Sequence, residues 1–392
     1  MAAFVRSNRF AFKGGVTMGR HSKKVMVMES VKDWVINGRV KPGDRIYSEY
    51  ELSKLFDVSR HTVRLAIGEL VDEGWLYREQ GVGTFCGEPF ASRKGQKIAN
   101  GKNIGVMTTY LSDYIFPSII RGMETYLTER GYSLTLVCTE NDHAKERLCI
   151  RKLLDLNVDG LILEPTKSSH FNPNLDYYLE LEERHIPYVM INQYYSQLSP
   201  FYLIMNDVKG GYMATDHLIQ LGHETILGLF QSDDLQGVHR MQGFLQALRN
   251  ERLTIAPELV VTFTTEELHA GLEEKILNTL TNRKNMPTAI VCYNDYVAVI
   301  VHKVLQKLHL SVPEDISLVG FDDTALADSP NLPLTTIAHP KSHMGIDAAR
   351  RIIAAVEGKE YNLSLDDPII YEPELVIRSS TDVVKKNRSA VF

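Results

Sequence analysis

Apolar residues near the start of the chain recur at spacings of three and four, which is the period of an amphipathic helix. A first segment runs from residue 25 to about residue 37 and is stopped by Gly38 and by Pro42-Gly43. A second segment covers residues 47–56. Its predicted apolar stripe consists of Leu52, Leu55 and Phe56. Both segments are therefore predicted to be helices.

Short polar residues mark where the second and third helices begin. Ser48 is followed three residues later by Glu51, which is the pattern of a capping box. With Ser59 as the N-cap of the next helix, its hydroxyl accepts a backbone N–H of the first turn. The buried face of this third helix is predicted to consist of Val63, Ile67 and Leu70. After Gly74, residues alternate on either side of Gly81-Val82-Gly83, which predicts a two-stranded wing. The whole pattern predicts a winged helix-turn-helix.

Two arginines stand at the start of the third helix. Arg60 and Arg64 are four residues apart, so they share a face near the positive end of the helix dipole. We expect this pair to need an anionic partner outside the chain, such as the phosphate of a nucleic acid. The simpler alternative for such residues is a solvated face. The capping box, the short turn and the wing together favour nucleic acid.

Residues 38–85 resemble the DNA-binding head of the GntR family of bacterial transcription regulators. The resemblance departs at Tyr47, where the family usually has proline, and at Tyr50, where it often has a basic or polar residue. It implies sequence-specific binding to double-stranded operator DNA. The DNA contacts that it implies are Glu49, Arg60, His61, Thr62, Arg64, Gln80, Gly81 and Gly83. Glycine in the wing would let the backbone approach the minor groove.

Charge is distributed unevenly along the chain. Residues 21–97 hold 13 Lys and Arg against 11 Asp and Glu, whereas residues 98–392 hold 26 against 38. Affinity for DNA therefore has to come from a few placed cations in the first part. The acidic remainder is expected to be repelled by the duplex.

From residue 103 onward, short apolar runs alternate with helical patterns, which indicates βα units and a parallel sheet covered on both faces. The alternation restarts at residues 201–207, and a last helix is predicted around residues 343–358. Two such blocks imply two Rossmann-like lobes with a ligand cleft at the carboxyl ends of their strands. The predicted fold class is α/β: a winged helix-turn-helix followed by a two-lobed domain like that of periplasmic binding proteins.

The predicted organisation has five parts. They are a disordered N-terminal extension at 1–20, the DNA-binding domain at 21–87, a flexible linker at 88–102, the two-lobed domain at 103–379 and a tail at 380–392. The linker is rich in Gly, Ser, Lys and Asn and lacks an apolar period. Translation could start at Met18 instead of Met1, because one set of codons for KGGVTM reads as a purine-rich ribosome-binding sequence followed by a start codon at Met18.

Residues 103–379 resemble the sugar-sensing domain of the LacI/GalR family. The motifs that carry this resemblance are GGYMATDHLIQLGH, HRMQGF, MPTAIVCYNDYVAV, PEDISLVGFDD and LTTIAHP. Joined to a GntR-type head, they make the chain similar to the family of bacterial repressors of L-arabinose utilisation. That resemblance implies a homodimer that leaves operator DNA when L-arabinose binds. The alternative is the same architecture with another sugar, a purine or a phosphorylated metabolite as effector.

A pentose presents hydroxyls that donate and accept hydrogen bonds and an apolar ring face, so its site needs planar charged groups and an aromatic ring. Residues just past predicted strands lie at the edge of the cleft. The candidates for effector binding are Tyr114, Phe116, Glu164, Arg240, Asn294, Asp322 and His339. The resemblance implies a sugar contact for Arg240, Asn294 and Asp322. We expect Glu164 to pair with Arg240 when the site is empty.

Several of these candidates have a simpler structural alternative. Asp322 and Asp323 could cap a turn, Glu164 could be a solvated loop carboxylate, and Tyr114 could serve packing alone. Few basic residues beyond Arg240 are expected at the cleft, which disfavours a phosphorylated ligand.

Other classes of protein lack their motifs in this sequence. A nucleophile elbow, a P-loop and a dinucleotide-binding glycine motif are absent, so we expect no enzymatic activity. No cofactor is expected, and His217 and His223 have no third ligand at metal spacing. The four cysteines are expected to be buried thiols. Without a long apolar run or a signal-peptide pattern, the predicted location is the cytoplasm.

Overall fold

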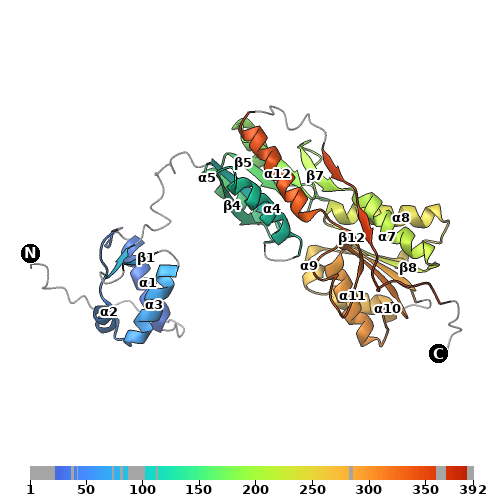
Figure 1. Cartoon of the computed structure of the whole chain (residues 1–392), viewed down its shortest axis with the longest axis horizontal. Coiled ribbons are helices and arrows are strands. Elements are labelled where there is room, and N and C mark those ends of the chain that lie inside the picture. The colour runs from blue at the N-terminus through green and yellow to red at the C-terminus, as the bar shows by residue number, and fades with distance from the viewer. Residues whose placement is uncertain are drawn as a thin grey trace, which may run out of the picture. The chain divides into compact units, whose positions relative to one another are not determined.

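The computed structural model describes residues 23–36, 39–41, 43–72, 75–79, 83–86, 102–111, 114–281, 286–358 and 368–385. Its contacts divide the chain into two compact units, Met1–Asn100 and Gly101–Phe392 (Figure 1). We call the described part of the first unit the head and that of the second unit the body.

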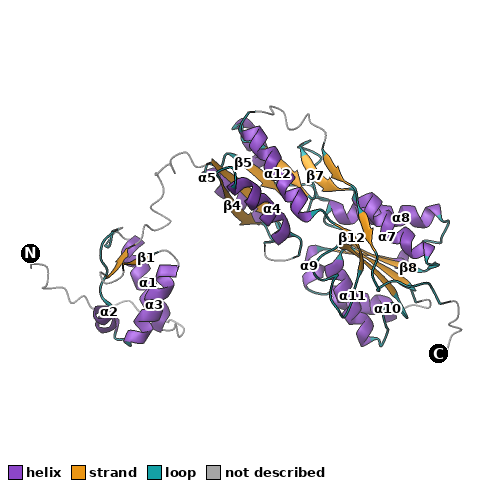
Figure 2. Cartoon of the chain, viewed as in Figure 1, coloured by secondary structure: helices purple, strands orange, loops and turns teal. Residues whose placement is uncertain are grey.

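The head consists of three helices and a two-stranded wing (Figure 2). Its elements are α1 (Lys23–Ile36), α2 (Glu49–Phe56), α3 (Arg60–Asp72), β1 (Leu76–Glu79) and β2 (Gly83–Cys86). The two strands are antiparallel, with Leu76 opposite Cys86. One apolar core joins the elements, and its fully buried members include Val27, Leu52, Val63, Ile67 and Leu70. The predicted winged helix-turn-helix is confirmed.

The apolar stripe predicted on α2 is wrong at one position. Leu52 is fully buried, and the ring of Phe56 stacks on Trp34 of α1 with 5.6 Å between centroids. Leu55, however, is 57% exposed. Each residue turns an α-helix by about 100°, so Leu55 points well away from the direction of Phe56. The stripe is therefore narrower than the spacing alone indicates.

The first lobe of the body is built on a six-stranded sheet. Its strands are β3 (Lys102–Thr108), β4 (Tyr132–Cys138), β5 (Gly160–Leu163), β6 (Tyr188–Ile191), β7 (Tyr202–Met205) and β13 (Ile369–Tyr371). Its helices are α4 (Phe116–Thr128), α5 (His143–Asp155), α6 (Leu175–Glu183) and α12 (Lys341–Val356). The strand order is β13-β7-β6-β5-β3-β4, and every pairing is parallel.

The second lobe is built on another six-stranded sheet. Its strands are β8 (Ile226–Gln231), β9 (Val260–Phe263), β10 (Ala289–Cys292), β11 (Ser317–Asp322), β12 (Thr335–Ala338) and β14 (Glu374–Val376). Its helices are α7 (Asp207–Gln220), α8 (Leu235–Asn250), α9 (Thr265–His269), α10 (Leu272–Thr281) and α11 (Asp295–Lys307), with a 3-10 turn at Pro257–Leu259. The order is β14-β12-β11-β10-β8-β9, and only the β12–β14 pairing is antiparallel.

Each of the two sheets has an apolar core on both faces. In the first lobe, α4 and α12 cover one face and α5 and α6 the other. In the second lobe, α7 and α8 cover one face and α10 and α11 the other. Strands that are buried on both faces read as continuous apolar runs, which is why the sequence pattern predicted this class correctly.

The division of the body between the lobes differs from the prediction. The sequence pattern makes residues 201–207 the opening of the second lobe and places the last helix in it. In the structure, β7 lies between β6 and β13 in the first sheet, and α12 packs along α4 in the first lobe (Figure 1). The chain therefore crosses between the lobes three times, after β7, after β12 and after β13. The β7–β13 and α4–α12 contacts join segments far apart in the chain, so the order of apolar runs does not reveal them.

The segment predicted as a tail from residue 380 is corrected as far as residue 385. The Leu318 amide donates to the Ser380 carbonyl at 2.8 Å, and the Thr335 amide donates to Ser380 Oγ at 2.8 Å. The Val384 amide donates to the Leu221 carbonyl at 3.0 Å. These residues are fastened to the second lobe. The predicted extension lies outside the described residues, as does the linker except for Lys102 in β3.

Candidate functional site

Hydroxyl caps fix the two helices of the candidate DNA-binding surface. The Thr62 amide donates to Ser59 Oγ at 3.1 Å, and this bond begins α3 at Arg60. On α2, the Glu51 amide donates to Ser48 Oγ at 3.3 Å and the Ser48 amide donates to Glu51 Oε2 at 2.8 Å. Both predicted caps are confirmed. They set the start of α3 by satisfying backbone donors that the helix itself leaves open.

Arg64 has a partner inside the chain, which corrects the expectation for one of the two arginines. Its Nε and Nη2 donate to Oε2 of Glu49 at 3.2 and 3.1 Å. Nη2 of Arg78 on β1 lies 3.9 Å from the other oxygen of this carboxylate. The hydrogen bond with Glu49 raises the pKa of Arg64. Glu49 therefore connects α2 to α3 and to the wing and orients Arg64 on the surface.

Arg60 and His61 are exposed at the start of α3. The ring of Tyr50 on α2 lies 4.4 Å from Lys54 Nζ and 6.0 Å from the guanidinium carbon of Arg60. Tyr50, which stands where the GntR family often has a basic or polar residue, thus contacts two cations through its ring face. Arg60 keeps its charge available to a ligand, since a ring does not neutralise it.

Of the wing residues expected to contact DNA, Gln80 and Gly81 lie outside the described residues. Gly83 is the first residue of β2 and has a φ of 155°. A Cβ atom at this position would lie 2.8 Å from Arg45 Nε. The Arg45 side chain is flexible and can shift, so the main reason for glycine at this end of the wing is the φ of Gly83, which other residues rarely adopt.

A cavity of about 210 Å³ lies in the body. Five of the seven predicted effector contacts line it: Tyr114, Phe116, Glu164, Asn294 and Asp322. The residues around it come from both lobes and from the carboxyl ends of strands such as β5, β10 and β11. Arg240 and His339 are not in its lining, and they are 2% and 5% exposed.

Arg240 is held by three groups and none of them is Glu164, so the expected pair is wrong. Its Nε donates to Asp207 Oδ1 at 2.8 Å, Nη1 to the Tyr293 carbonyl at 2.8 Å and Nη2 to Asp322 Oδ1 at 3.3 Å. The guanidinium also stacks 3.6 Å from the centroid of the Phe321 ring. Asp207 is the first residue of α7, which packs closely on α8: a Cβ atom on Gly211 would lie 2.2 Å from the Arg240 carbonyl oxygen. Burial raises the pKa of Asp207 to about 6.

Glu164 belongs instead to a polar network in the first lobe. It accepts hydrogen bonds from the amide and hydroxyl of Thr109 at 2.8 and 2.5 Å and from Asn192 Nδ2 at 2.8 Å. Burial raises the pKa of Glu164 to about 7. This buried, fully bonded carboxylate is not the solvated loop residue of the simpler alternative.

His339 continues this network at the crossover from β12 to α12. Its Nε2 lies 3.2 Å from Asn192 Oδ1, and its buried Nδ1 has no hydrogen-bond partner among the described residues. Burial lowers the pKa of His339 to about 4, so the ring is neutral at physiological pH. Because Nε2 donates to Asn192 Oδ1, the neutral ring can accept one further hydrogen bond at Nδ1.

Tyr114, which lines the cavity, connects the first lobe to the second. Its hydroxyl donates to the Phe321 carbonyl at 2.8 Å and accepts from the Asp295 amide at 3.0 Å. Burial raises the pKa of Tyr114 well above its ordinary value. Packing alone therefore does not describe this residue.

Sequence reasoning missed several residues of the cavity. Those with hydrogen-bonding or aromatic side chains are Thr109, Tyr110, Asn141, Gln193, Gln231, Asp234, Gln236, His269, Tyr293 and Tyr296. Asp234 is the N-cap of α8; it accepts from the Gly237 amide and from the Tyr293 hydroxyl, both at 2.6 Å. Burial raises the pKa of Asp234 to about 7. It follows β8 by three residues, so the rule that selected Glu164 would have found it too.

Further hydrogen bonds join the lobes beside the cavity. The amide of Leu235 at the start of α8 donates to Ser168 Oγ at 2.9 Å and to Gln193 Oε1 at 3.2 Å. Asn141 Nδ2 donates to Thr265 Oγ1 at 2.6 Å. The structure therefore has its lobes in contact around the cavity.

The remaining chemistry-bearing residues have structural surroundings. His217 is bonded to Thr381, and His223 to Thr288 and the Asp382 carbonyl. No cluster of three His, Cys, Asp or Glu suited to a metal ion occurs among the described residues. Cys86 and Cys292 are buried as expected, whereas Cys138 and Cys149 are half-buried. None of the described helices has the length and apolar character needed to cross a membrane.

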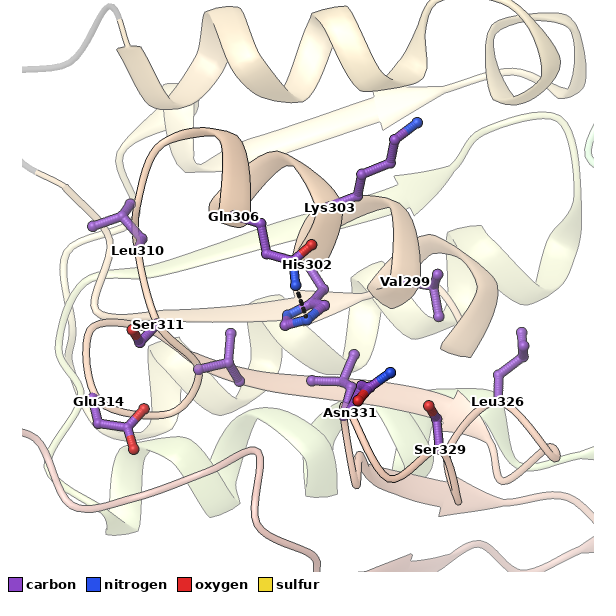
Figure 3. Close-up of a pocket in the computed structure, with 12 residues that line it drawn as sticks. Val299, His302, Lys303, Gln306, Leu310, Ser311, Glu314, Leu326, Ser329 and Asn331 are labelled. Atoms are coloured by element: carbon purple, nitrogen blue, oxygen red, sulfur yellow. Dashed lines mark hydrogen bonds between the residues drawn. The ribbon is translucent and has the colours of Figure 1, made fainter.

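A second hollow of about 700 Å³ lies on the second lobe. Figure 3 shows Val299, His302, Lys303 and Gln306 of α11 on one side of it and Ser329 and Asn331, from the loop between β11 and β12, on the other. None of the predicted effector contacts lines it. Its position on an outer helix face distinguishes it from a cleft at strand ends.

Comparison with known proteins assigns both units. Residues 23–86 match the model of bacterial regulatory proteins of the gntR family, and residues 215–381 match the periplasmic binding protein-like domain. The chain is 48% identical over 369 residues to the arabinose metabolism transcriptional repressor of Halalkalibacterium halodurans, covering 94% of this chain and 98% of that protein. It is 45% identical to the arabinose metabolism transcriptional repressor of Geobacillus stearothermophilus, covering 92% and 97%.

Solved structures share the fold. A complex of the transcriptional regulator CelR with cellobiose matches with a TM-score of 0.62 and 22% identity, covering 92% of this chain and all of that chain. A LacI transcriptional regulator from a Rhodococcus species matches with a TM-score of 0.59 and 27% identity, covering 72% and 99%.

Proposed function

The chain belongs to the family of arabinose metabolism transcriptional repressors, and we therefore propose that it represses genes of L-arabinose utilisation until L-arabinose enters the body. Members of this family are DNA-binding repressors with a sugar-binding domain, and they are not enzymes. The head supplies the operator contact. Sugar in the body lowers the affinity of the head for operator DNA.

The observation that carries the sugar assignment is the chemistry of the cavity. Its volume of about 210 Å³ lies below the ~300–1,000 Å³ of pockets for drug-sized ligands, which suits a single sugar ring. Its lining combines aromatic rings such as Tyr110 and Phe116 with amides and carboxylates. Among the described lining residues, none is Lys or Arg, whereas Glu164, Asp234 and Asp322 are acidic. A neutral polyol fits this lining, and a phosphorylated metabolite does not.

Isothermal titration calorimetry tests the assignment on the full chain. The panel contains L-arabinose, D-xylose, D-ribose, D-galactose and a pentose 5-phosphate. We expect L-arabinose to bind most tightly and the phosphorylated pentose not to bind. Tighter binding of another sugar would support the alternative effector. Tight binding of the phosphate ester would contradict the proposal that the cavity binds a neutral sugar.

We assign the operator contact to the start of α3 and to the wing. Helices of this motif enter the major groove with their N-terminal residues toward the base edges. Arg60, His61 and Thr62 occupy that end of α3, and Glu49 orients Arg64 beside them. The contacts expected of Gln80, Gly81 and Gly83 are assigned to the adjacent minor groove, which glycine lets the backbone approach.

A homodimer is proposed through the hollow on α11. Its apolar lining residues are Val299, Leu310, Val312, Leu326 and Leu332. Lys303 and Glu314 supply both signs of charge in the same lining. A surface with both signs can pair with a copy of itself about a two-fold axis, and two heads then bind two half-sites of a near-palindrome.

Sedimentation velocity tests this surface. We expect Val299→Asp to shift the full chain to the monomer at concentrations where the unmodified chain is a dimer. Leu148→Asp is the control, because Leu148 is 60% exposed on α5, away from the hollow. A dimer that survives Val299→Asp would place the contact elsewhere.

No cofactor is assigned beyond the sugar effector, and the cytoplasm is the proposed location. Operator DNA and imported sugar meet in that compartment.

A further inference from the structure

The turn after β11 has a backbone conformation that side chains other than glycine rarely adopt. Asp322 has a φ of 95° and Asp323 a φ of 48°. Successive non-glycine residues with positive φ persist only where their surroundings hold them. This turn carries the carboxylate of Asp322, which lines the sugar cavity and accepts from Arg240.

The side chain of Lys341 holds this turn at its carbonyl groups. Its Nζ donates to the carbonyl of Asp322 at 2.5 Å and to that of Asp323 at 2.8 Å. Hydrogen bonds from a charged donor are the stronger ones, and these act directly on the two residues with unusual φ. The neighbouring hydrogen bonds reach other acceptors. Tyr114 donates to the Phe321 carbonyl, and Arg378 donates to the Asp323 carboxylate at 2.8 Å.

Lys341 stands where the chain crosses from one lobe to the other. β12 ends at Ala338 in the second sheet, and Lys341 is the first residue of α12, which packs in the first lobe. The packing of α12 on α4 is tight, because a Cβ atom on Gly345 would lie 2.1 Å from the Ile119 carbonyl oxygen. The start of α12 therefore moves with the first lobe, while the turn that Lys341 holds belongs to the second.

We propose that Lys341 is a positioning residue of the sugar site. Through its two hydrogen bonds, the angle between the lobes determines how the Asp322 carboxylate is positioned in the cavity. Lys341 is absent from the lining of the cavity, so it acts on the sugar through the turn. A change in lobe angle draws Nζ away from the two carbonyls, and the turn relaxes toward negative φ. Sugar held by Asp322 favours, in return, the lobe angle that keeps these hydrogen bonds. This inference rests on the proposed function. It adds a structural connection between sugar in the cavity and α12.

The test compares Lys341→Met, Lys341→Arg and Lys307→Met in the full chain. Methionine keeps the length of the side chain and removes its donors. Lys307 is the matched control, because it is 53% exposed on α11 and pairs with Glu273. For Lys341→Met we expect the Kd for L-arabinose to rise roughly tenfold, as for the loss of charged hydrogen bonds. Lys341→Arg restores most of the affinity, and Lys307→Met leaves it unchanged.

Two further readouts separate positioning from a general structural role. Combined with Asp322→Asn, Lys341→Met should add little to the Kd, since both changes act through the same carboxylate. The operator affinity of the sugar-free protein should stay within twofold of the unmodified chain. An unchanged Kd in Lys341→Met, full additivity with Asp322→Asn, or a loss that arginine does not restore would each overturn the proposal.

Hydrogen exchange of the sugar-free protein tests Lys341 independently of the ligand. The Thr324 amide donates to buried Asp295 at 2.8 Å and the Asp323 amide to Thr336 Oγ1 at 3.3 Å, so both are protected in the structure. We expect faster exchange at these amides in Lys341→Met than in Lys307→Met. Equal exchange refutes the positioning role. Faster exchange in a chain that binds no sugar of the panel would refute the proposed function and leave the positioning role standing.

Discussion

The head and the body each contain an arginine bonded to carboxylates, but in opposite surroundings. The side chains of Arg64 and Glu49 in the head are 61% and 28% exposed. Arg240 in the body and its partners Asp207 and Asp322 are each 2–3% exposed. An exposed pair contributes little to stability, so Arg64 can exchange Glu49 for a DNA phosphate or base at small cost. A buried set cannot exchange partners without leaving a charge uncompensated, so Arg240 acts as a fixed support for Asp322.

Removal of Arg240 should produce the largest effect, because two buried carboxylates would lose their counter-ion. We expect Arg240→Met to lower the free energy of unfolding by about 3–5 kcal/mol, measured by urea unfolding of the full chain. Arg350→Met is the control: Arg350 is 59% exposed beside Asp347, and its loss should cost less than about 0.5 kcal/mol. An equal loss of unfolding free energy in the two variants would contradict the difference inferred between the buried and the exposed pair.

Removal of Arg64 should separate binding from stability. We expect Arg64→Ala to leave urea unfolding unchanged and to lower operator affinity by roughly ten- to a hundredfold, as for the loss of a base contact. Fluorescence anisotropy with labelled operator measures the second effect, and Arg350→Ala serves as the control. Loss of stability together with affinity would show that the Arg64–Glu49 pair supports the fold of the head.

The burial of acidic groups predicts a pH dependence of the body. Burial raises the pKa of Asp234 to about 7, so the folded chain holds a proton that the unfolded chain has already released. This contribution to stability is fully present below the unfolded pKa and is lost as the pH rises through about 7. Between pH 5 and 7, Asp234→Asn should flatten the fall of unfolding free energy by up to about 1.4 kcal/mol per pH unit. Asparagine can still cap α8. A slope unchanged by this substitution would show that Asp234 is ionised in the folded chain throughout that range.

Glu49 offers the smallest test of the contrast. Glu49→Gln keeps the shape of the side chain and removes its charge, so Arg64 loses orientation but remains cationic. We expect a change of only a few-fold in operator affinity, with no change in unfolding, because an exposed pair is weak. A loss as large as that of Arg64→Ala would make Glu49 itself a DNA contact.

The elements of the head could be predicted from its sequence because they depend on local chemistry. For the body, only the fold class could be predicted. The caps at Ser48 and Ser59 act within three residues, so their spacing alone predicts where α2 and α3 begin. The prediction that Leu55 belongs to the apolar stripe was wrong, because the width of such a stripe depends on which neighbours cover the helix. In the body, continuous apolar runs predicted buried parallel strands, but β7 and α12 were placed in the wrong lobe. β7 pairs with β6, which directly precedes it, so the restart of the pattern did not mark a new lobe; the other partner of β7, β13, and the partner of α12, α4, lie far away in the chain.

The cavity proposed to bind sugar shows the same limit at the level of single residues. The rule that ligands lie past strand ends selected Glu164, Asn294, Asp322 and His339. The first three line the cavity, whereas His339 does not. The partner of Arg240 was wrong because Asp207 lies on another helix, and only the close packing of α7 on α8 brings it there. Lys341 was missed because its role depends on an unusual backbone turn, which no spacing of residues announces.

The most direct test of the account is operator affinity measured with and without L-arabinose on the same full-length protein. Fluorescence anisotropy with a labelled operator fragment, at fixed ionic strength, should give a Kd that rises about 5- to 150-fold in saturating L-arabinose, the usual range of coupling between two sites. The same factor should appear in the Kd for L-arabinose when operator DNA is bound. An operator Kd that is equal in saturating L-arabinose and in its absence would contradict the account.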